Sequence, residues 1–365
     1  MIQGSSGRRM RILTVIGNRP QFIKAAAVTP ALRRVHQEVM VHTGQHFDEE
    51  LSAVFFSELG LPAPERELGI ALGSNTSQTA RMLTALEPVI EEVTPDAVLV
   101  YGDTNSTLAG ALAGAQATVP VAHVEAGMRS FDRRMPEELN RILADHAGDL
   151  LLCSSELAAQ NLRAEGVRGS VEVVGDVMVD VALKVQPQAR DRTDLLERWG
   201  LRSGEYVLAT AHRPGNVDDP GRLEMLVDLL TSLPREVIWP LHPRTRQRLE
   251  RGDLLEPLRN AAGVTLTPPL GYVEVSALLC NARAVMTDSG GLQKEAYLAG
   301  IPCVTLRGTT EWGETVEHGW NTVVDLDRER ALEALDRDPP PDRPPLYGDG
   351  RAGERVVSAL TLRLQ

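Results

Sequence analysis

Acidic side chains follow several apolar segments in the amino-terminal half of the chain. Asp103 and Glu125 each come at the end of such a segment, and Glu137 follows Pro136 at the start of an expected helix. Removing a proton from carbon needs a placed base, and returning it needs an acid, so two or three carboxylates around one carbon suit proton transfer there. We therefore interpret Asp103, Glu125 and Glu137 as candidate acid–base groups.

Each of these acids also has a structural interpretation. Asp103 could form an Asx turn with Thr104. One member of the Glu137-Glu138 pair could be a first-turn acid that the helix dipole favours, close to Arg141. These alternatives stay open from the sequence, although purely structural roles for all of the acids together are a weaker explanation than a shared chemical one.

The carboxy-terminal half offers a sequence suited to binding an anion. Ser289, Gly290 and Gly291 follow an expected strand and open a helix, so phosphate can approach free backbone N–H groups at the positive end of the helix dipole. Glu295, about one turn further along the helix, could accept hydrogen bonds from ribose hydroxyls. The alternatives are an ordinary turn with Ser289 as its N-cap and a solvated charge at Glu295.

Cations stand near two other strand ends. Arg19 and Lys24 lie in a segment with one glycine, Gly17, which does not fit the G-x-G-x-x-G pattern and disfavours NAD. They suit an anion, although plain surface cations are the alternative for each. His212 follows the first strand of the second half, where a histidine could neutralise or protonate a leaving phosphate. His123 is better explained as a satisfied core histidine.

Composition excludes several classes of function. The net charge of −12 argues against non-specific nucleic-acid binding. The three cysteines, Cys153, Cys280 and Cys303, are far apart and read as buried free thiols of a reducing, cytoplasmic compartment. The sequence contains no H-E-x-x-H motif, which would indicate a metal site. It also contains no apolar run long enough to span a membrane. The polar amino terminus lacks the apolar region of a signal peptide.

Parallel β-sheets must position these side chains, because short apolar segments alternate with helical periodicity. The expected strands are 11–17, 39–45, 97–102, 119–125, 150–155 and 171–175 in a first set, then 206–212, 236–242, 264–270, 284–288, 302–307 and 322–325 in a second. Ligands of such sheets bind beyond the carboxyl ends of the strands. The sequence predicts an α/β fold with two Rossmann-like domains whose parallel sheets face a cleft.

Domain limits follow from the polar stretch 186–194, which places the boundary near Val185–Leu201. We expect one domain over 10–185, with the carboxylates, and a second over 201–345, with the anion-binding loop. The proline-rich segment 339–345 is a stiff connector. The helix expected over 352–364 would pack back on the first domain.

Six motifs taken together resemble the non-hydrolysing UDP-N-acetylglucosamine 2-epimerase family, over essentially all of residues 10–349. They are G-N-R-P-Q-F-I-K at 17–24, Y-G-D-T-N-S at 101–106, H-V-E-A-G-M-R-S at 123–130, P-E-E-L-N-R at 136–141, T-A-H-R at 210–213 and T-D-S-G-G-L-Q at 287–293.

The resemblance implies a fold of the glycosyltransferase-B type, usually in a homodimer, and reversible conversion of UDP-GlcNAc to UDP-ManNAc without metal or nicotinamide cofactor. In the family's scheme a base removes H2 as UDP leaves, which gives a 2-acetamidoglucal, and UDP then adds back with protonation on the other face of C2. Because H2 is not acidic in the parent sugar, its removal must be coupled to departure of a stabilised diphosphate.

The resemblance also assigns roles to the candidate residues. It implies acid–base work for Asp103, Glu125 and Glu137, with His212 as a further catalytic group at the phosphate. The remaining substrate contacts that it implies are Arg19, Lys24, Arg129, Arg141, His242, Ser289, Gly290, Gly291, Glu295 and Arg307. Gln45 and His46 are candidates for a regulatory site near the cleft.

Departures from the common pattern leave the sugar open. Asn18, Gln21 and Gly215 replace Thr, Glu and an acid, and 309–317 differs from the frequent T-E-R-P-E form. Some relatives with a similar R-P-Q-F-I-K stretch act on UDP-2,3-diacetamido-glucuronate, whose carboxylate would need a cation such as Arg133 or Arg134. A glycosyltransferase of the same architecture and a non-catalytic UDP-sugar sensor are the rival functions.

Overall fold

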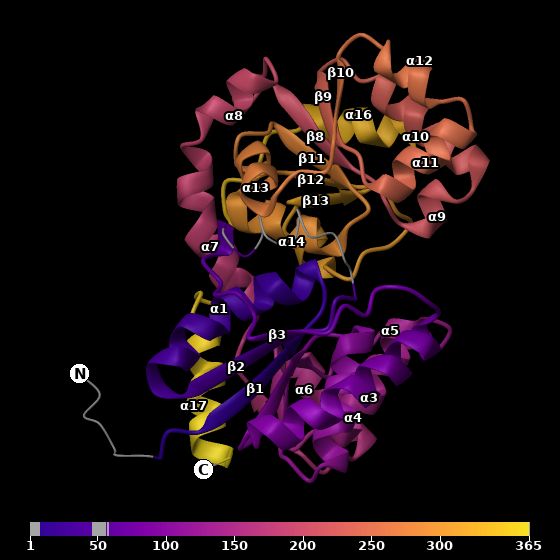
Figure 1. Cartoon of the computed structure of the whole chain (residues 1–365). Coiled ribbons are helices and arrows are strands. Elements are labelled where there is room, and N and C mark those ends of the chain that lie inside the picture. Colours follow the sequence, from indigo (N-terminus) through magenta and orange to yellow (C-terminus); the bar gives the residue numbers. More distant parts are fainter. Residues whose placement is uncertain (1–7, 46–55, 57, 365) are drawn as a thin grey trace. The chain divides into compact units, whose positions relative to one another are not determined.

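The computed structural model describes residues 8–45, 56 and 58–364. The chain divides into two compact units, Met1–Val181 with Tyr347–Gln365, and Ala182–Leu346 (Figure 1). The division falls inside helix α7 (Val177–Arg190), before the polar stretch at which the boundary was expected. Polar residues do not interrupt this helix, which is why composition alone placed the boundary too late.

The first unit contains a seven-stranded parallel sheet of order β3-β2-β1-β4-β5-β6-β7. Its strands are β1 (Arg11–Ile16), β2 (Gln37–His42), β3 (Arg66–Glu67), β4 (Ala97–Tyr101), β5 (Val121–Ala126), β6 (Leu150–Cys153) and β7 (Ser170–Val173). The buried apolar runs of β1, β4 and β6 explain why these strands were predicted. β3 was not predicted, because its two exposed, charged residues carry no apolar signal.

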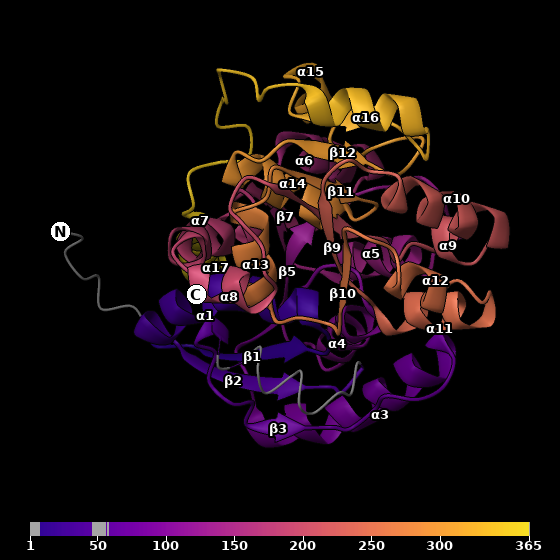
Figure 2. The same ribbon diagram turned by 90° about the horizontal axis from the view of Figure 1, so that it is seen from above.

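Helices cover this sheet, and the last helix of the chain is one of them. They are α1 (Arg19–Val35), α3 (Asn75–Val93), α4 (Asn105–Gln116), α5 (Pro136–Ala147), α6 (Glu156–Glu165) and α17 (Ala352–Leu364). α17 packs against α1 (Figure 1 and Figure 2). The Asp180 carboxylate accepts hydrogen bonds from the backbone N–H groups of Ala352 and Gly353 at 3.0 and 2.7 Å. The last helix is therefore part of the first unit.

The second unit contains a six-stranded parallel sheet of order β10-β9-β8-β11-β12-β13. Its strands are β8 (Tyr206–Thr210), β9 (Glu236–Pro240), β10 (Val264–Thr267), β11 (Ala284–Thr287), β12 (Cys303–Thr305) and β13 (Asn321–Val323). Its helices are α8 (Thr193–Arg198), α9 (Pro214–Val217), α10 (Pro220–Thr231), α11 (Pro243–Arg251), α12 (Leu255–Arg259), α13 (Tyr272–Cys280), α14 (Gly290–Ala299), α15 (Gly313–Glu317) and α16 (Arg328–Asp336).

Alternation along β8 builds two cores in the second unit. Val207 and Ala209 belong to one buried cluster, whereas Tyr206 and Leu208 belong to another. Successive side chains of a strand point to opposite faces of a sheet, so both faces are covered by helices. This arrangement confirms the predicted α/β class with two parallel sheets.

Each sheet contains the strand-order reversal at which Rossmann-like folds bind ligands. In the first sheet β1 lies between β2 and β4, and in the second β8 lies between β9 and β11. The polar segments noted in the sequence follow β1, β4 and β5 in one unit and β8, β9 and β11 in the other. Cys153, Cys280 and Cys303 are buried and free, as predicted. Over the described ranges, no helix is long and apolar enough to cross a bilayer.

We predict that Gly353→Ala destabilises the first unit by about 1–3 kcal/mol, the usual cost of overpacking a well-packed contact. A Cβ on Gly353 would lie 2.2 Å from the carbonyl oxygen of Ala27 in α1. Urea unfolding followed by circular dichroism measures the change. Gly221→Ala is the matched control, because Gly221 is also the second residue of a helix and its Cβ would meet no atom closer than 3.4 Å. Equal stability of both variants would contradict the predicted contact.

Candidate functional site

Two of the predicted acids, Asp103 just after β4 and Glu125 near the end of β5, lie where the backbone adopts positive φ angles. Gly102 has φ +64° and Glu125 has φ +70°, and the pairing of β5 with β6 shifts register between Val124 and Ala126. A positive φ is uncommon for a residue other than glycine, and such conformations cluster at functional sites. The bulge at Glu125 is therefore a feature of the site rather than of the sheet alone.

Glu125 forms an ion pair with Lys24 of α1. Burial acts to lower the pKa of Lys24, but the attraction of Glu125 and Asp103 outweighs it and holds the pKa above its usual value. A side chain at Gly102 would collide with this pair, because its Cβ would lie 2.7 Å from Lys24 Nζ. Lys24, predicted to contact an anion of the substrate, is thus the internal counter-ion of Glu125.

Asp103 is paired in a similar way with Arg141 of α5. Arg141 Nη2 donates to Asp103 Oδ2 at 2.5 Å, and Asn140 Nδ2 donates to the Asp103 carbonyl oxygen at 3.0 Å. Thr104 caps α4, and its N–H donates to the Thr107 hydroxyl at 3.1 Å. The alternative of an Asx turn is not realised, so the Asp103 carboxylate, 27% exposed, faces a cation instead.

The Glu137-Glu138 pair divides into one structural and one exposed acid. The buried Glu138 carboxylate accepts from Ser130 N at 2.8 Å, Ser130 Oγ at 2.9 Å, Phe131 N at 2.9 Å and Arg141 Nη1 at 3.1 Å. Burial acts to raise the pKa of Glu138, but these hydrogen bonds outweigh it and hold the pKa below its usual value. Glu137 is exposed at the first turn of α5, where a substrate can reach it.

Arg129 needs a correction. Its side chain is only 1% exposed, and its guanidinium donates to Glu165 through two hydrogen bonds, at 2.7 and 2.8 Å. A third contact joins its Nη1 to Asp145 Oδ2 at 2.7 Å. The structure therefore gives Arg129 a role inside the unit in place of the predicted substrate contact. His123 is a buried core histidine, as predicted, and it also contacts Asp145.

Asp288 organises the turn after β8 in the second unit. Its fully buried carboxylate accepts from the N–H groups of His212 and Arg213, at 3.1 and 3.0 Å, and from Asn216 Nδ2 at 3.1 Å. Burial lowers the pKa of His212 below its usual value, and the attraction of Asp288 only partly opposes this. This direction favours the neutral form of the His212 ring. The His212 and His242 rings lie 5.9 Å apart.

The amino terminus of α14 is built from the predicted small residues. Ser289 is the N-cap, and its hydroxyl accepts from Leu292 N at 3.5 Å, so the structural interpretation of this residue holds without excluding the other. Trp312 Nε1 donates to the Gly290 carbonyl oxygen at 2.7 Å. Glu295 is buried one turn into the same helix. First-turn N–H groups of a helix are ready donors to an anion.

Arg307 is bound to an acid that the sequence analysis did not single out. Its guanidinium donates to both oxygens of Glu311 at 2.9 Å. Burial acts to raise the pKa of Glu311, but Arg307 and Arg213 outweigh it and hold the pKa below its usual value. The departure of 309–317 from the common motif was the signal that could have identified Glu311 and Trp312.

Three predicted residues lie at the loops after β1 and β2. Arg19 is partly exposed at the start of α1. The Gln45 side-chain oxygen accepts from Ser106 N and Oγ at 3.0 and 2.7 Å, which fixes the first turn of α4. His46, the other candidate for regulation, lies outside the described residues.

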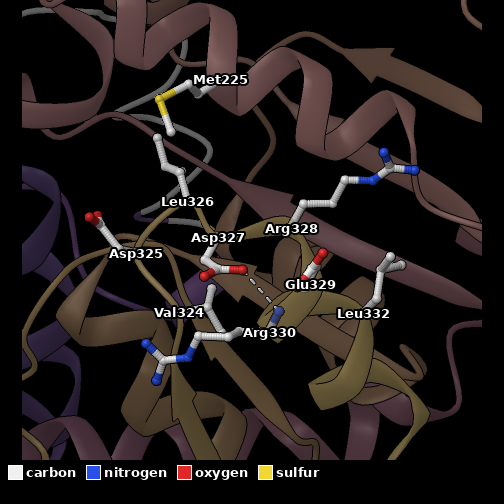
Figure 3. Close-up of a pocket in the computed structure, with 9 residues that line it drawn as sticks. All are labelled: Met225, Val324, Asp325, Leu326, Asp327, Arg328, Glu329, Arg330 and Leu332. Carbon is white, nitrogen blue, oxygen red and sulfur yellow. Dashed lines mark hydrogen bonds between the residues drawn. The ribbon is translucent and has the colours of Figure 1, made fainter.

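A surface pocket of about 810 Å³ lies elsewhere, between α10 and the start of α16. Figure 3 shows its lining residues, Met225, Val324, Asp325, Leu326, Asp327, Arg328, Glu329, Arg330 and Leu332. None of these was predicted to act on a substrate, so the pocket is not the candidate site. In the described part of the chain, no group of three or more His, Cys, Asp or Glu side chains is placed to hold a metal ion.

Comparison with known proteins gives one consistent family. The sequence model of the family described as UDP-N-acetylglucosamine 2-epimerase matches residues 31–361. A Methanococcus maripaludis protein described as a UDP-N-acetylglucosamine 2-epimerase homolog is 44% identical over 96% of this chain and 99% of its own length. The UDP-2,3-diacetamido-2,3-dideoxy-D-glucuronate 2-epimerase of Pseudomonas aeruginosa is 45% identical over the same shares of the two chains.

A solved structure agrees with the sequence matches. The UDP-GlcNAc 2-epimerase of Methanocaldococcus jannaschii, crystallised with UDP-GlcNAc and UDP, superposes with a TM-score of 0.87 at 38% identity. The match covers 97% of this chain and all of the other. Such a match over both units confirms a glycosyltransferase-B-like fold with two Rossmann-like domains.

We predict that Glu138→Gln lowers the free energy of unfolding by about 2–4 kcal/mol at neutral pH, because a carboxamide cannot accept from four donors and leaves buried groups unpaired. The pKa of Glu138 is depressed in the folded state. The stabilisation that its carboxylate adds to the free energy of unfolding is therefore complete above the ordinary pKa of 4.5, and it is lost as the pH falls through the pKa of the folded state. Denaturant unfolding at several pH values should show the difference shrinking in acid. Glu137→Gln, on the exposed neighbour, is the control. A pH-independent difference would contradict the assignment.

Proposed function

The chain belongs to the UDP-N-acetylglucosamine 2-epimerase family, of the non-hydrolysing type, and on that premise we propose that it interconverts UDP-GlcNAc and UDP-ManNAc. One observation carries the proposal beyond family membership. Two partly exposed carboxylates, Asp103 and Glu125, lie at the carboxyl ends of adjacent parallel strands, and each is paired with its own cation. A pair of this kind suits removal of a proton from one face of a carbon and its return on the other.

The acid–base groups of the first unit fit the two halves of the reaction. A neighbouring cation stabilises the carboxylate form, which is the form that removes a proton. We assign the removal and return of H2 to Asp103 and Glu125, with Glu137 as a third, more exposed acid. As H2 leaves, the bond from C1 to the diphosphate breaks and a 2-acetamidoglucal forms. Addition of UDP to C1 with protonation of C2 on the opposite face gives the epimer.

The groups of the second unit fit the leaving diphosphate. The charge that develops on the diphosphate needs donors already in place, because ordering them during the reaction would raise the barrier. We assign this role to the N–H groups at Ser289, Gly290 and Gly291, with the neutral His212 ring as a further donor. In the same proposal, Arg19 and Arg141 are the cations that the first unit supplies. His242 and Arg307 are further contacts of the nucleotide, and Glu295 binds its ribose.

A second substrate has one observation in its favour. The Pseudomonas aeruginosa relative at 45% identity acts on a UDP-2,3-diacetamido uronate, whose extra carboxylate needs a cation. Both arginines are exposed, but Arg134 is bound to Asp132 through hydrogen bonds of 2.8 Å. We therefore treat Arg133 as the residue to test for this substrate. A homodimer in the cytoplasm is the accompanying proposal from the family resemblance and the free thiols.

The protein in D2O with UDP-GlcNAc alone should place deuterium at C2 and form UDP-ManNAc, because the proton that returns comes from solvent. Proton NMR follows the loss of the H2 signal. The same assay with UDP-2,3-diacetamido-glucuronate decides the substrate by the larger kcat/KM. Release of free sugar would indicate a transferase or hydrolase, and binding of either nucleotide sugar with no exchange would indicate a sensor.

Glu125→Gln should keep UDP binding by calorimetry and lose turnover by more than about a hundredfold, the low end of general acid–base contributions. The change also leaves Lys24 without its counter-ion, so thermal unfolding must first show that the variant is folded at the assay temperature. Glu156→Gln is the control, because Glu156 is an exposed acid of the same unit paired with Arg163. Unchanged turnover would remove Glu125 from the proposed chemistry.

A further inference from the structure

Two fully buried polar side chains lie behind the carboxylate turns of the first unit. They are His123, on β5, and Asp145, on α5, and both side chains are 0% exposed. His123 Nδ1 lies 2.7 Å from Asp145 Oδ1, and His123 Nε2 lies 2.6 Å from the carbonyl oxygen of Gly102. The ring therefore contacts the residue that precedes Asp103, and it is itself two residues before Glu125.

The partners of the ring define its hydrogen-bonding state. The Gly102 carbonyl can only accept, so His123 Nε2 donates. Asp145 Oδ2 accepts from Gly127 N at 3.1 Å and lies 2.7 Å from Arg129 Nη1, as expected of an ionised carboxylate. Its Oδ1 then also accepts, and His123 Nδ1 donates. The protein therefore engages both nitrogens of the ring, one through Gly102 and the other through Asp145.

Charged groups of opposite sign surround this pair. Burial acts to raise the pKa of Asp145, but His123 and then Arg129 outweigh it and hold the pKa below its usual value. Arg129 is in turn bound by Glu165, so two cations and two carboxylates form one network. His146 stands at its outer end, 3.4 Å from Glu165. A buried charge is tolerated only when it is paired and hydrogen-bonded in this way.

The network ends on the backbone of both carboxylate turns. Through His123 it holds the carbonyl of Gly102, and through Asp145 it holds the N–H of Gly127. The residues at these turns have positive φ, +64° at Gly102, +70° at Glu125 and +80° at Gly127. Glycine adopts this conformation readily, but at Glu125 it costs energy and persists only where the surroundings over-determine it.

We propose that His123 and Asp145 are positioning residues for the 2-epimerisation, and that their buried ion pair sets the spacing of Asp103 and Glu125. The inference rests on the proposed function. It goes further in assigning work to two residues that touch no substrate. A side chain of similar size that donates only one hydrogen bond in place of the ring would leave one of the two turns without its contact. A small misplacement of a reacting group can then cost about a hundredfold in rate.

His123→Gln tests this directly, with His146→Gln as the matched control. The control removes the other histidine that borders the network, which is partly exposed and contacts neither turn. We expect His123→Gln to lower kcat about a hundredfold. UDP affinity by calorimetry and KM should stay within the error of the measurement, because the proposed nucleotide contacts lie mainly in the second unit. His146→Gln should keep the wild-type kcat.

A structural role alone would give a different pattern. It would lower the unfolding temperature and the folded fraction, while the folded enzyme kept its kcat. Rates are therefore referred to folded protein, measured by thermal unfolding and active-site titration with UDP. Unchanged kcat in folded His123→Gln would overturn the proposal.

A second measurement uses the wild-type protein and therefore does not depend on whether a variant folds. Nitrogen NMR of wild-type protein labelled at histidine should show one ring with hydrogen-bond couplings to both Asp145 and Gly102. Loss of either coupling in the folded wild-type protein would overturn the proposal, because the ring would then hold only one of the two turns. If the wild-type protein fails to exchange H2, the proposed function is wrong. The NMR result does not depend on that outcome.

Discussion

Two carboxylates held beside two cations are the constraint on which the first unit depends. Asp103 with Arg141 and Glu125 with Lys24 place four charges after two adjacent strands, where water is only partly excluded. Contacts in the surrounding structure fix these pairs, which is what the proposed acid–base role requires. Gly102 leaves space for the Lys24 ammonium, Glu138 holds Arg141, and the bulge of β5 sets the backbone of Glu125.

The proposed anion site of the second unit is built differently from the carboxylate pairs of the first unit. A diphosphate is large and strongly charged, and the proposed site for it consists mainly of backbone N–H groups rather than of side-chain ion pairs. The buried Asp288 carboxylate organises the turn that carries His212 and Arg213, and Trp312 ties its indole to the first residue of α14. Donors fixed in this way lose little freedom when a ligand binds, which favours both binding and departure of the same group.

The departures from the common family motif have local explanations. The Gln21 carboxamide accepts from Gly17 N at 2.7 Å and donates to the Tyr101 carbonyl at 2.9 Å, which joins the loops after β1 and β4. A carboxylate cannot make the second of these bonds. Trp312, in the other departing segment, donates its indole N–H to the Gly290 carbonyl oxygen. Both residues fix loops that carry candidate site groups, so they bear on how the substrate is held rather than on the type of reaction.

The sequence by itself determined the α/β class, most of the central strands and the residues able to do acid–base and anion-binding chemistry, because buried strands and glycine-rich turns leave a signal in local composition. It did not determine β3, whose two charged residues have no such signal, or the division inside α7. Only the tertiary structure decided which cation serves which acid. Arg129 was expected at the substrate, but Asp145 and Glu165, which are 16 and 36 residues away in the chain, enclose it. In the Glu137-Glu138 pair, Glu138 has the structural role. Pairings of this kind depend on distances across the fold, and local sequence does not encode them.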